Sequence, residues 1–286
     1  MNKSGWLNIN KPCGYTSTRV VNILKRILKC KKIGHGGTLD PFASGVLPVC
    51  LNSATKTVEC VMDHSKTYSF SLVFGKSTDS FDIDGNILDS NDKVPTEKEI
   101  LDIIPSFIGK IAQVPPKYSA LKINGVRACD LVREGKDVLM ESRDVEIFDL
   151  RLNKIVNRNT FEFTVDCGRG CYIRSLGVDI ASRLGMLAYV SKLTRLRVGN
   201  FKIENSIDVK DFENINECCI IGLDDILDMP SYSCSEEEHN KLKNGCSIFN
   251  SNICSCERLK IKFNDDVICI ANCRNNFIKS IVWLAC

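Results

Sequence analysis

Acidic residues are almost absent from the amino-terminal fifth of the chain. Asp40 is the only carboxylate among residues 1–58, which contain nine lysines and arginines. Nearby cations favour the charged form of a carboxylate, so we expect Asp40 to be ionised at neutral pH. A carboxylate repels phosphate, and its presence in a basic segment therefore favours chemistry on a nucleic acid over simple electrostatic binding. The alternative is an ordinary turn, for which Asp40-Pro41 is a suitable pair.

The 16 cysteines lack the spacing of a metal site or a disulfide framework, because no CxxC pair occurs. The first twelve residues lack the apolar run of a signal peptide, and no stretch reaches the length of a membrane span. We therefore expect a cytoplasmic protein with reduced thiols and no contact with a membrane. The acidic run 80–91 superficially resembles a calcium loop, but Ser80 and Asn91 occupy its first and twelfth positions, so no metal is expected.

The net charge of +3 is small, but basic residues are concentrated in two segments. Residues 1–39 contain eight lysines and arginines and no acid, and residues 168–202 contain seven against the single acid Asp179. If the fold brings the segments together, they form one phosphate-binding surface. Two separate solvated faces are an equally good reading of the charge pattern.

The length of 286 residues and the hydrophobic content of 44% allow one large domain and a small one. The periodic patterns are interrupted around Asp228-Met-Pro230. We therefore predict a large domain over residues 1–230 and a small β-rich module over residues 231–286.

Local patterns predict several elements. Residues 16–18 offer caps for a helix whose apolar stripe contains Val20, Val21, Leu24, Ile27 and Leu28. Alternation over 66–74 predicts a strand with Tyr68 on its apolar face, and Thr96 with Glu99 predicts a capped helix that ends at Gly109. Further strands are predicted over 145–152 and 160–167, a helix starts near Arg174, and the tail should hold a helix capped by Ser235 and strands between Leu259 and Trp283.

Six dispersed runs make the chain recognisable. They are NKPCGYTS at 10–17, GHGGTLDP at 34–41 with ASGVLP at 43–48, KTY at 66–68, GKSTDSFDIDG at 75–85, PPKYSALK at 115–122 with Gly125, and GCYIRSL at 170–176. In this order and spacing, the sequence resembles the bacterial TruB family of tRNA pseudouridine-55 synthases over residues 5–205. The tail resembles the family's small RNA-binding module less closely.

The resemblance implies an α+β fold, with a mixed, largely antiparallel central sheet flanked by helices and a small β-rich C-terminal RNA-binding module. It implies isomerisation of the T-loop uridine at tRNA position 55, with Asp40 as the catalytic carboxylate. Arg174 would pair with Asp40, and Tyr68 would stack on the target base and serve in the proton transfer. Taken without the resemblance, Arg174 is better read as a surface phosphate ligand and Tyr68 as a core residue.

Further site residues follow from the same resemblance. His35 would hold the target uridine out of its stack, and Tyr172 and Leu193 would line the uracil pocket. Lys11, Pro12, Gly14 and Gly37 would support the catalytic loop, and Asp79 and Asp82 would shape a neighbouring loop. Core packing or a solvated turn is the plainer reading for several of these positions.

The resemblance also implies the partners. The substrate would be the T-arm of tRNA, clamped by shape and phosphate contacts, and the enzyme would act as a monomer without a metal, nucleotide or redox cofactor and without an obligate protein partner. The first alternative is a non-catalytic tRNA-binding or folding factor that keeps Asp40 for loop architecture. The second is the guide-dependent archaeal and eukaryotic relative, which acts in a ribonucleoprotein.

Overall fold

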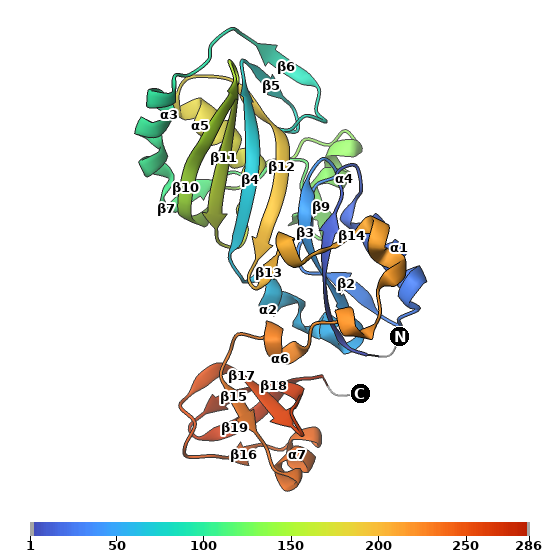
Figure 1. Ribbon diagram of the computed structural model, residues 1–286. Helices are drawn as coiled ribbons and strands as arrows, with labels where there is room; N and C mark the ends of the chain where they lie inside the picture. Colours follow the sequence, from blue (N-terminus) through green and yellow to red (C-terminus); the bar gives the residue numbers. More distant parts are fainter. Residues whose placement is uncertain (1–2, 285–286) are drawn as a thin grey trace.

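The computed structural model describes residues 3–284, which form two large β-sheets and two small hairpins with helices around them (Figure 1). The larger sheet has ten strands in the order β14-β1-β3-β12-β4-β11-β10-β7, with β13 paired to β12 and β2 paired to β3. The strands are β1 (Gly5–Lys11), β2 (Ile33–His35), β3 (Ser44–Leu51), β4 (Lys66–Phe74), β7 (Gly109–Gln113), β10 (Arg143–Asn157), β11 (Thr160–Cys167), β12 (Ala188–Val198), β13 (Phe201–Lys202) and β14 (Ile207–Asp208).

Most neighbours in the larger sheet are antiparallel, and two pairs are parallel, β1 with β14 and β12 with β3. The prediction of a mixed, largely antiparallel sheet is therefore confirmed. The parallel pair places Arg195 opposite Gly45. This pairing brings the second basic segment beside the loop that carries Asp40.

The predicted strand over 66–74 is β4, with the same bounds. Tyr68, Phe70, Leu72 and Phe74 are buried, as the alternation predicted. Phe70 stacks on Phe163 of β11 with ring centroids 5.2 Å apart. Burial of a large apolar side chain contributes roughly 1.5–3 kcal/mol, so β4 is a main support of the core.

Seven α-helices within residues 3–284 surround the sheets. They are α1 (Ser17–Leu28), α2 (Val58–Met62), α3 (Glu97–Ile103), α4 (Ala128–Arg133), α5 (Ile173–Arg183), α6 (Leu223–Ile226) and α7 (Glu236–Lys243). The Thr16 side chain caps α1 by accepting from the Arg19 N–H, and Val20, Val21, Leu24 and Leu28 are buried. Ile27 is 37% exposed, so its assignment to the apolar stripe was wrong: it lies at the edge of the buried face.

The helix predicted between Thr96 and Gly109 is shorter than expected. Thr96 and Glu99 form the predicted capping box, but α3 ends at Ile103 and a 3-10 helix follows over Ile104–Phe107. Pro105 explains the difference, because proline lacks the N–H that an α-helix needs and its ring clashes with the preceding turn. The tighter 3-10 turn accommodates it at the start of a new element.

Short elements lie around the larger sheet. The small hairpins are β5 (Lys76–Thr78) with β6 (Ile87–Ser90) and β8 (Lys122–Ile123) with β9 (Val126–Arg127). Further 3-10 helices cover Asn52–Thr57, Ile203–Asn205, Val209–Asn214 and Glu217–Cys219.

The second sheet contains five strands in the order β15-β17-β18-β19-β16 and packs against α7. Its strands are β15 (Ser231–Ser233), β16 (Ile248–Phe249), β17 (Cys256–Phe263), β18 (Asp266–Arg274) and β19 (Phe277–Trp283). Ser235 and Glu238 form a capping box on α7, as predicted. Lys260 Nζ reaches the carbonyl oxygens of Asp224 and Leu227 and so ties this sheet to α6. The division of the chain at residue 230 stays a prediction.

No helix among residues 3–284 is long and apolar enough to cross a membrane.

Asp179 of α5 is a half-buried carboxylate. Its Oδ2 atom is buried without a hydrogen-bond donor, beside a hollow of about 600 Å³ between α5 and the Ile104–Phe107 turn. Burial raises the pKa of Asp179 to about 6. The folded state therefore holds this proton more tightly than the unfolded state, and Asp179 lowers stability as the pH rises through the window from about 4 to 6.

We predict that Asp179→Asn raises the free energy of unfolding at pH 8 by about 1–2 kcal/mol, after allowance for partial solvent screening. Below pH 4 the variant and the wild type should agree, because both side chains are then neutral. Urea unfolding at pH 4 and pH 8 measures the difference, with the exposed Asp92→Asn as control. Equal stability at pH 8 would contradict the assignment.

Gly45 marks a close approach between β3 and β12. Its φ is +102°, and a Cβ there would stand 2.2 Å from the Arg195 carbonyl oxygen. Gly14 has a φ of +81°, and a Cβ added to it would meet no atom within 4 Å. Like Gly45 it has a backbone conformation that favours glycine, but it lacks the steric contact.

We predict that Gly45→Ala lowers the free energy of unfolding by about 2–4 kcal/mol, from backbone strain plus the clash. Gly14→Ala should cost only about 1 kcal/mol. Urea unfolding of both variants provides the comparison. Equal losses of unfolding free energy in the two variants would show that the structure relieves the clash with the Arg195 carbonyl without cost.

Candidate active site

The loop that carries Asp40, residues 36–43, connects β2 to β3 and is held by the segment before α1; we call it the Asp40 loop. The Ser17 hydroxyl accepts from the Leu39 N–H at 2.9 Å and donates to the Leu39 carbonyl at 3.1 Å. The Gly14 N–H donates to the Pro41 carbonyl at 2.8 Å. Residues before Asp40 and after it are therefore fixed independently of the carboxylate.

Lys11 supports the same segment from inside. Its ammonium group is buried and donates to the carbonyl oxygens of Pro12, Tyr15 and Pro41 at 3.0, 2.6 and 3.3 Å. Burial lowers the pKa of Lys11 to about 8. Lys11 and the Pro12 carbonyl thus lie where loop support was expected, and neither lines the pocket described below.

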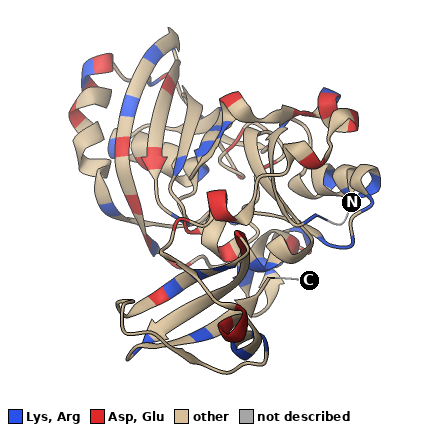
Figure 2. Cartoon of the chain, turned by 60° about the horizontal axis from the view of Figure 1, so that its bottom comes forward, with Lys and Arg blue, Asp and Glu red and all other residues tan. Residues whose placement is uncertain are grey.

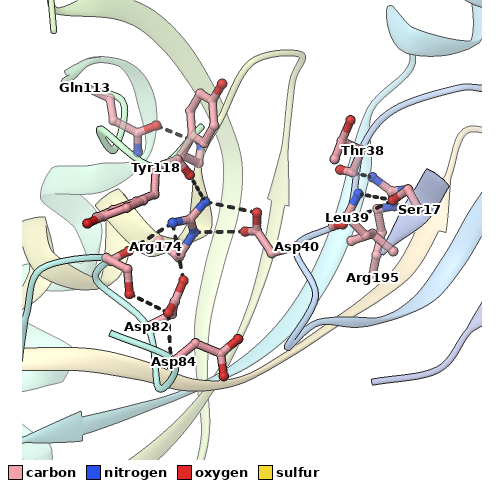
Figure 3. A network of polar contacts seen from close by, with 12 residues as sticks. Ser17, Thr38, Leu39, Asp40, Asp82, Asp84, Gln113, Tyr118, Arg174 and Arg195 are labelled. Atoms are coloured by element: carbon pink, nitrogen blue, oxygen red, sulfur yellow. Dashed lines mark hydrogen bonds and ion pairs between the residues drawn. The ribbon is translucent and has the colours of Figure 1, made fainter. Parts of the chain in front are cut away.

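Asp40 is gripped by Arg174, the second residue of α5. Arg174 Nε lies 2.8 Å from Asp40 Oδ2, and Nη2 donates to Oδ1 at 3.0 Å. The arginine side chain is 3% exposed and the carboxylate 31%. This two-point contact fixes the plane of the carboxylate and leaves one side of it open (Figure 3).

The other side of the Arg174 guanidinium faces the 79–85 loop (Figure 3). Nη1 lies 3.3 Å from Asp82 Oδ2 and donates to the Ser80 carbonyl at 2.9 Å, and Nη2 also donates to the Tyr118 carbonyl at 2.8 Å. Asp82 in turn accepts from the Ser80 hydroxyl and the Asp84 N–H. Burial raises the pKa of Asp82, while the Ser80 hydrogen bond and Arg174 oppose that shift.

A pocket of about 450 Å³ opens beside Asp40. Its lining includes Tyr68 of β4, Leu193 of β12, and Tyr172 just before α5. Tyr68 and Leu193 are almost fully buried, and burial raises the pKa of Tyr68 to about 12, so its phenol is neutral at physiological pH. An aromatic ring, an aliphatic side chain and a carboxylate thus share one cavity.

Tyr172 is positioned through its backbone. Its N–H donates to Gln113 Oε1 at 2.8 Å, and the Ser175 hydroxyl donates to the Val114 carbonyl at 2.7 Å. These contacts attach the start of α5 to the end of β7, so the helix presents Arg174 to Asp40 in one orientation.

His35 lies on a different side of the Asp40 loop. It lines an adjoining cleft of about 680 Å³, together with Thr16–Thr18, Asp40 and the acidic loop containing Asp79. Its Nδ1 atom is buried without a partner, and burial lowers the pKa of His35. The structure therefore brings Asp40, Tyr68, Arg174, Tyr172 and Leu193 to one pocket and places His35 at its neighbour.

The expected basic surface differs from the prediction. Arg174 and Arg195 of the second basic segment are 3% and 2% exposed and form part of the interior. Lys25, Arg26 and Lys29 of α1 are exposed. Figure 2 shows the remaining lysines and arginines spread over both sheets and α1 among acidic residues.

Sequence reasoning missed three residues that hold the site together. They are Ser17 and Arg195, which bind the backbone of the Asp40 loop, and Gln113, which binds the Tyr172 backbone. Each of these three residues binds backbone that is distant from it in sequence, so no local pattern predicts the contact. Arg195 belongs to the second basic segment, residues 168–202, for which a phosphate-binding surface and a solvated face were equally good readings.

The arrangement suits chemistry at a carbon centre by one oriented carboxylate. No group of three or more histidine, cysteine or acidic residues suitable for a metal ion occurs between residues 3 and 284. The pocket lining itself offers an oriented carboxylate, an aromatic wall and several cationic side chains.

Known proteins are similar to this chain in sequence and in fold. A model of the TruB family pseudouridylate synthase N-terminal domain matches residues 25–173. The tRNA pseudouridine synthase B of Ehrlichia canis is 39% identical, covering 97% of this chain and 96% of the relative, and that of Clostridium perfringens is 42% identical, covering 91% and 89%. In the crystal structure of a Cbf5-Nop10-Gar1 complex, one chain superposes with a TM-score of 0.75 and 26% identity, covering 97% of this chain and 83% of that one. Sequence and fold agree, and the chain belongs to the TruB family of pseudouridylate synthases.

Proposed function

We propose that the protein is a tRNA pseudouridine synthase that converts the T-loop uridine at position 55 to pseudouridine. The observation that carries the proposal is the Asp40 carboxylate, held at two points by buried Arg174 at the edge of a pocket lined by Tyr68, Tyr172 and Leu193. The bacterial relatives named tRNA pseudouridine synthase B, similar over nearly the whole chain, support the choice of substrate.

Asp40 acts as the nucleophile in this proposal. Its carboxylate attacks the anomeric carbon of the target ribose and displaces N1 of uracil, which leaves with the bonding electrons. The detached ring rotates in the pocket, and C5 then attacks the anomeric carbon and releases Asp40. Loss of the C5 proton and protonation of N1 complete an isomerisation in which no atom is gained or lost.

The pocket lining contains one carboxylate, that of Asp40, as recapture of the base requires. Glycosidases use two carboxyl groups, one of which protonates the leaving group. Asp82 does not line the pocket with Tyr68, and its oxygens face Arg174, the Ser80 hydroxyl and the Asp84 N–H. Without a general acid at the leaving base, the bond to uracil is re-formed and not hydrolysed.

The aromatic wall binds the base outside its stack. A base stacked on an aromatic side chain gains roughly 1–3 kcal/mol, which offsets the few kcal/mol needed to extrude a nucleotide. Tyr68 is the stacking residue, and because its phenol is neutral it can receive the C5 proton only as it passes its own proton to another base. Tyr172 and Leu193 close the walls. His35, in the adjoining cleft, supports the displaced nucleotide from the side of the RNA.

We infer that the T-arm of tRNA is the partner and that residues 231–286 form an RNA-binding module separate from a catalytic domain of residues 1–230. The enzyme would work in the cytoplasm as a monomer, without an obligate protein partner. Identities of 39% and 42% to the bacterial enzymes, against 26% to the Cbf5 chain, support this stand-alone form over a guide-dependent one.

We predict that Asp40→Asn reduces pseudouridine formation in an unmodified tRNA transcript at least about 1000-fold, equivalent to about 4 kcal/mol of transition-state stabilisation. Carbodiimide labelling and primer extension detect the product as a stop at the T-loop uridine. The exposed Asp89→Asn serves as control and should retain wild-type activity.

Two other results would change the account. Tight tRNA binding without a stop from the wild type would favour a non-catalytic binding factor. A stop from both the wild type and Asp40→Asn would preserve the activity and overturn the role of Asp40.

We also predict a steep dependence of tRNA affinity on salt, because each phosphate contact releases counterions and contributes a slope of about −0.7 to −0.9 in a plot of log affinity against log salt concentration. Filter binding between low and physiological salt measures the slope. A flat response would argue against phosphate contacts as the main source of affinity.

A further inference from the structure

Arg195 is a buried cation without a carboxylate partner. Its side chain is 2% exposed, and within residues 3–284 no acidic group lies at ion-pair distance from it. A charged group held in the interior needs compensating hydrogen bonds. The groups that provide them therefore indicate what Arg195 is there to hold.

Those groups are backbone carbonyls at the start of the Asp40 loop and in β3 just beyond its end. Arg195 Nη2 donates to the Gly37 carbonyl at 3.0 Å, and Nη1 lies at the limit of hydrogen bonding to the Thr38 carbonyl at 3.5 Å. Nε donates to the Val46 carbonyl at 2.7 Å. One planar guanidinium thus connects the residues that enter the loop with those that leave it.

The backbone of Arg195 contacts the same loop exit. Arg195 is the parallel-strand partner of Gly45, and the missing side chain of Gly45 lets the two backbones approach closely. Arg174 holds Asp40 by its carboxylate, whereas Arg195 contacts the loop on a different side (Figure 3). The loop is therefore fixed by two arginines with different tasks.

Arg195 also stands beside Tyr68. The two residues are cross-strand partners in β12 and β4, and both line the pocket. The guanidinium charge opposes the upward shift that burial imposes on the pKa of Tyr68. Arg195 therefore contacts the Asp40 loop and lies beside the aromatic wall at the same time.

We propose that Arg195 is a positioning residue for the reaction, which fixes the Asp40 loop and Tyr68 relative to each other. This inference rests on the proposed function for its kinetic consequence, but its structural consequence does not need it. Arginine is required because a planar fork reaches carbonyls on both ends of the loop, whereas a lysine ammonium is a compact donor on a flexible stem.

The test compares Arg195→Lys and Arg195→Met with Arg197→Met. Arg197 lies two residues further along β12 and also makes several contacts, to Thr67, Ser65 and Asp166. It does not line the pocket. The control therefore removes an arginine of similar connectivity from the same strand and leaves the Asp40 loop untouched.

The first measurement is the single-turnover rate with saturating tRNA transcript, alongside tRNA affinity. We expect the rate to fall at least about tenfold in Arg195→Lys and at least about 30-fold in Arg195→Met, with affinity within about threefold of wild type. The rate of Arg197→Met should stay within about threefold. A wild-type rate in Arg195→Lys, or equal losses in Arg195→Met and Arg197→Met, would overturn the proposal. If Arg195→Met does not fold, Arg195→Lys decides.

The second measurement is amide hydrogen exchange, which needs no activity. Peptides covering the Asp40 loop should exchange at least about tenfold faster in Arg195→Lys than in the wild type. In Arg197→Met their exchange rates should equal those of the wild type. Unchanged exchange in Arg195→Lys would overturn the positioning role even in an active enzyme. Faster exchange in Arg195→Lys, together with a wild type that makes no pseudouridine, would keep the role and reject the proposed function.

Discussion

The site depends on one buried guanidinium. Arg174 is 3% exposed and placed between Asp40 and Asp82, and removing one partner of a buried ion pair costs far more than the pair contributes over an apolar replacement. The Asp40 loop, the 79–85 loop and the start of α5 must therefore converge for the charge to be tolerated. The contact between Arg174 and Asp40 therefore both stabilises the fold and orients the carboxylate.

The architecture around this contact keeps the carboxylate fixed. Lys11 at the end of β1 and Ser17 at the start of α1 hold the backbone beside Asp40, and Arg195 holds the loop from β12. The pocket wall comes from β4, the central strand of the core. A carboxylate on a loop is thus held by the sheet, and such fixed geometry is what the proposed attack on a single carbon atom requires.

Local sequence patterns predicted those elements that local forces determine. The bounds of β4, the Thr16 cap of α1, both capping boxes and the place of Arg174 near a helix start follow from alternation, capping and periodicity. Pro105 indicates the early end of α3, but the apolar pattern that continues after Pro105 suggested a longer helix. The resemblance to a family supplied the site residues, which composition alone would have left as core or surface.

Long-range contacts account for what the sequence did not reveal. The parallel pairing of β12 with β3 converts Arg195 from an expected surface cation into an interior one, and no periodicity encodes that pairing. His35, at the end of β2, lines the neighbouring cleft and does not line the pocket that contains Tyr68. Both outcomes depend on which strands become neighbours, a choice made by the whole core.

The central claim is that Arg174 presents Asp40 to the ribose of a base bound against Tyr68. A crystal structure of the wild-type protein with an unmodified T-arm stem-loop tests it most directly. The account predicts that the target uridine has left its stack and lies against Tyr68, with its ribose facing Asp40 and the Arg174 contact intact. A uridine still stacked in the RNA loop, or Asp40 turned away from the ribose, would contradict it.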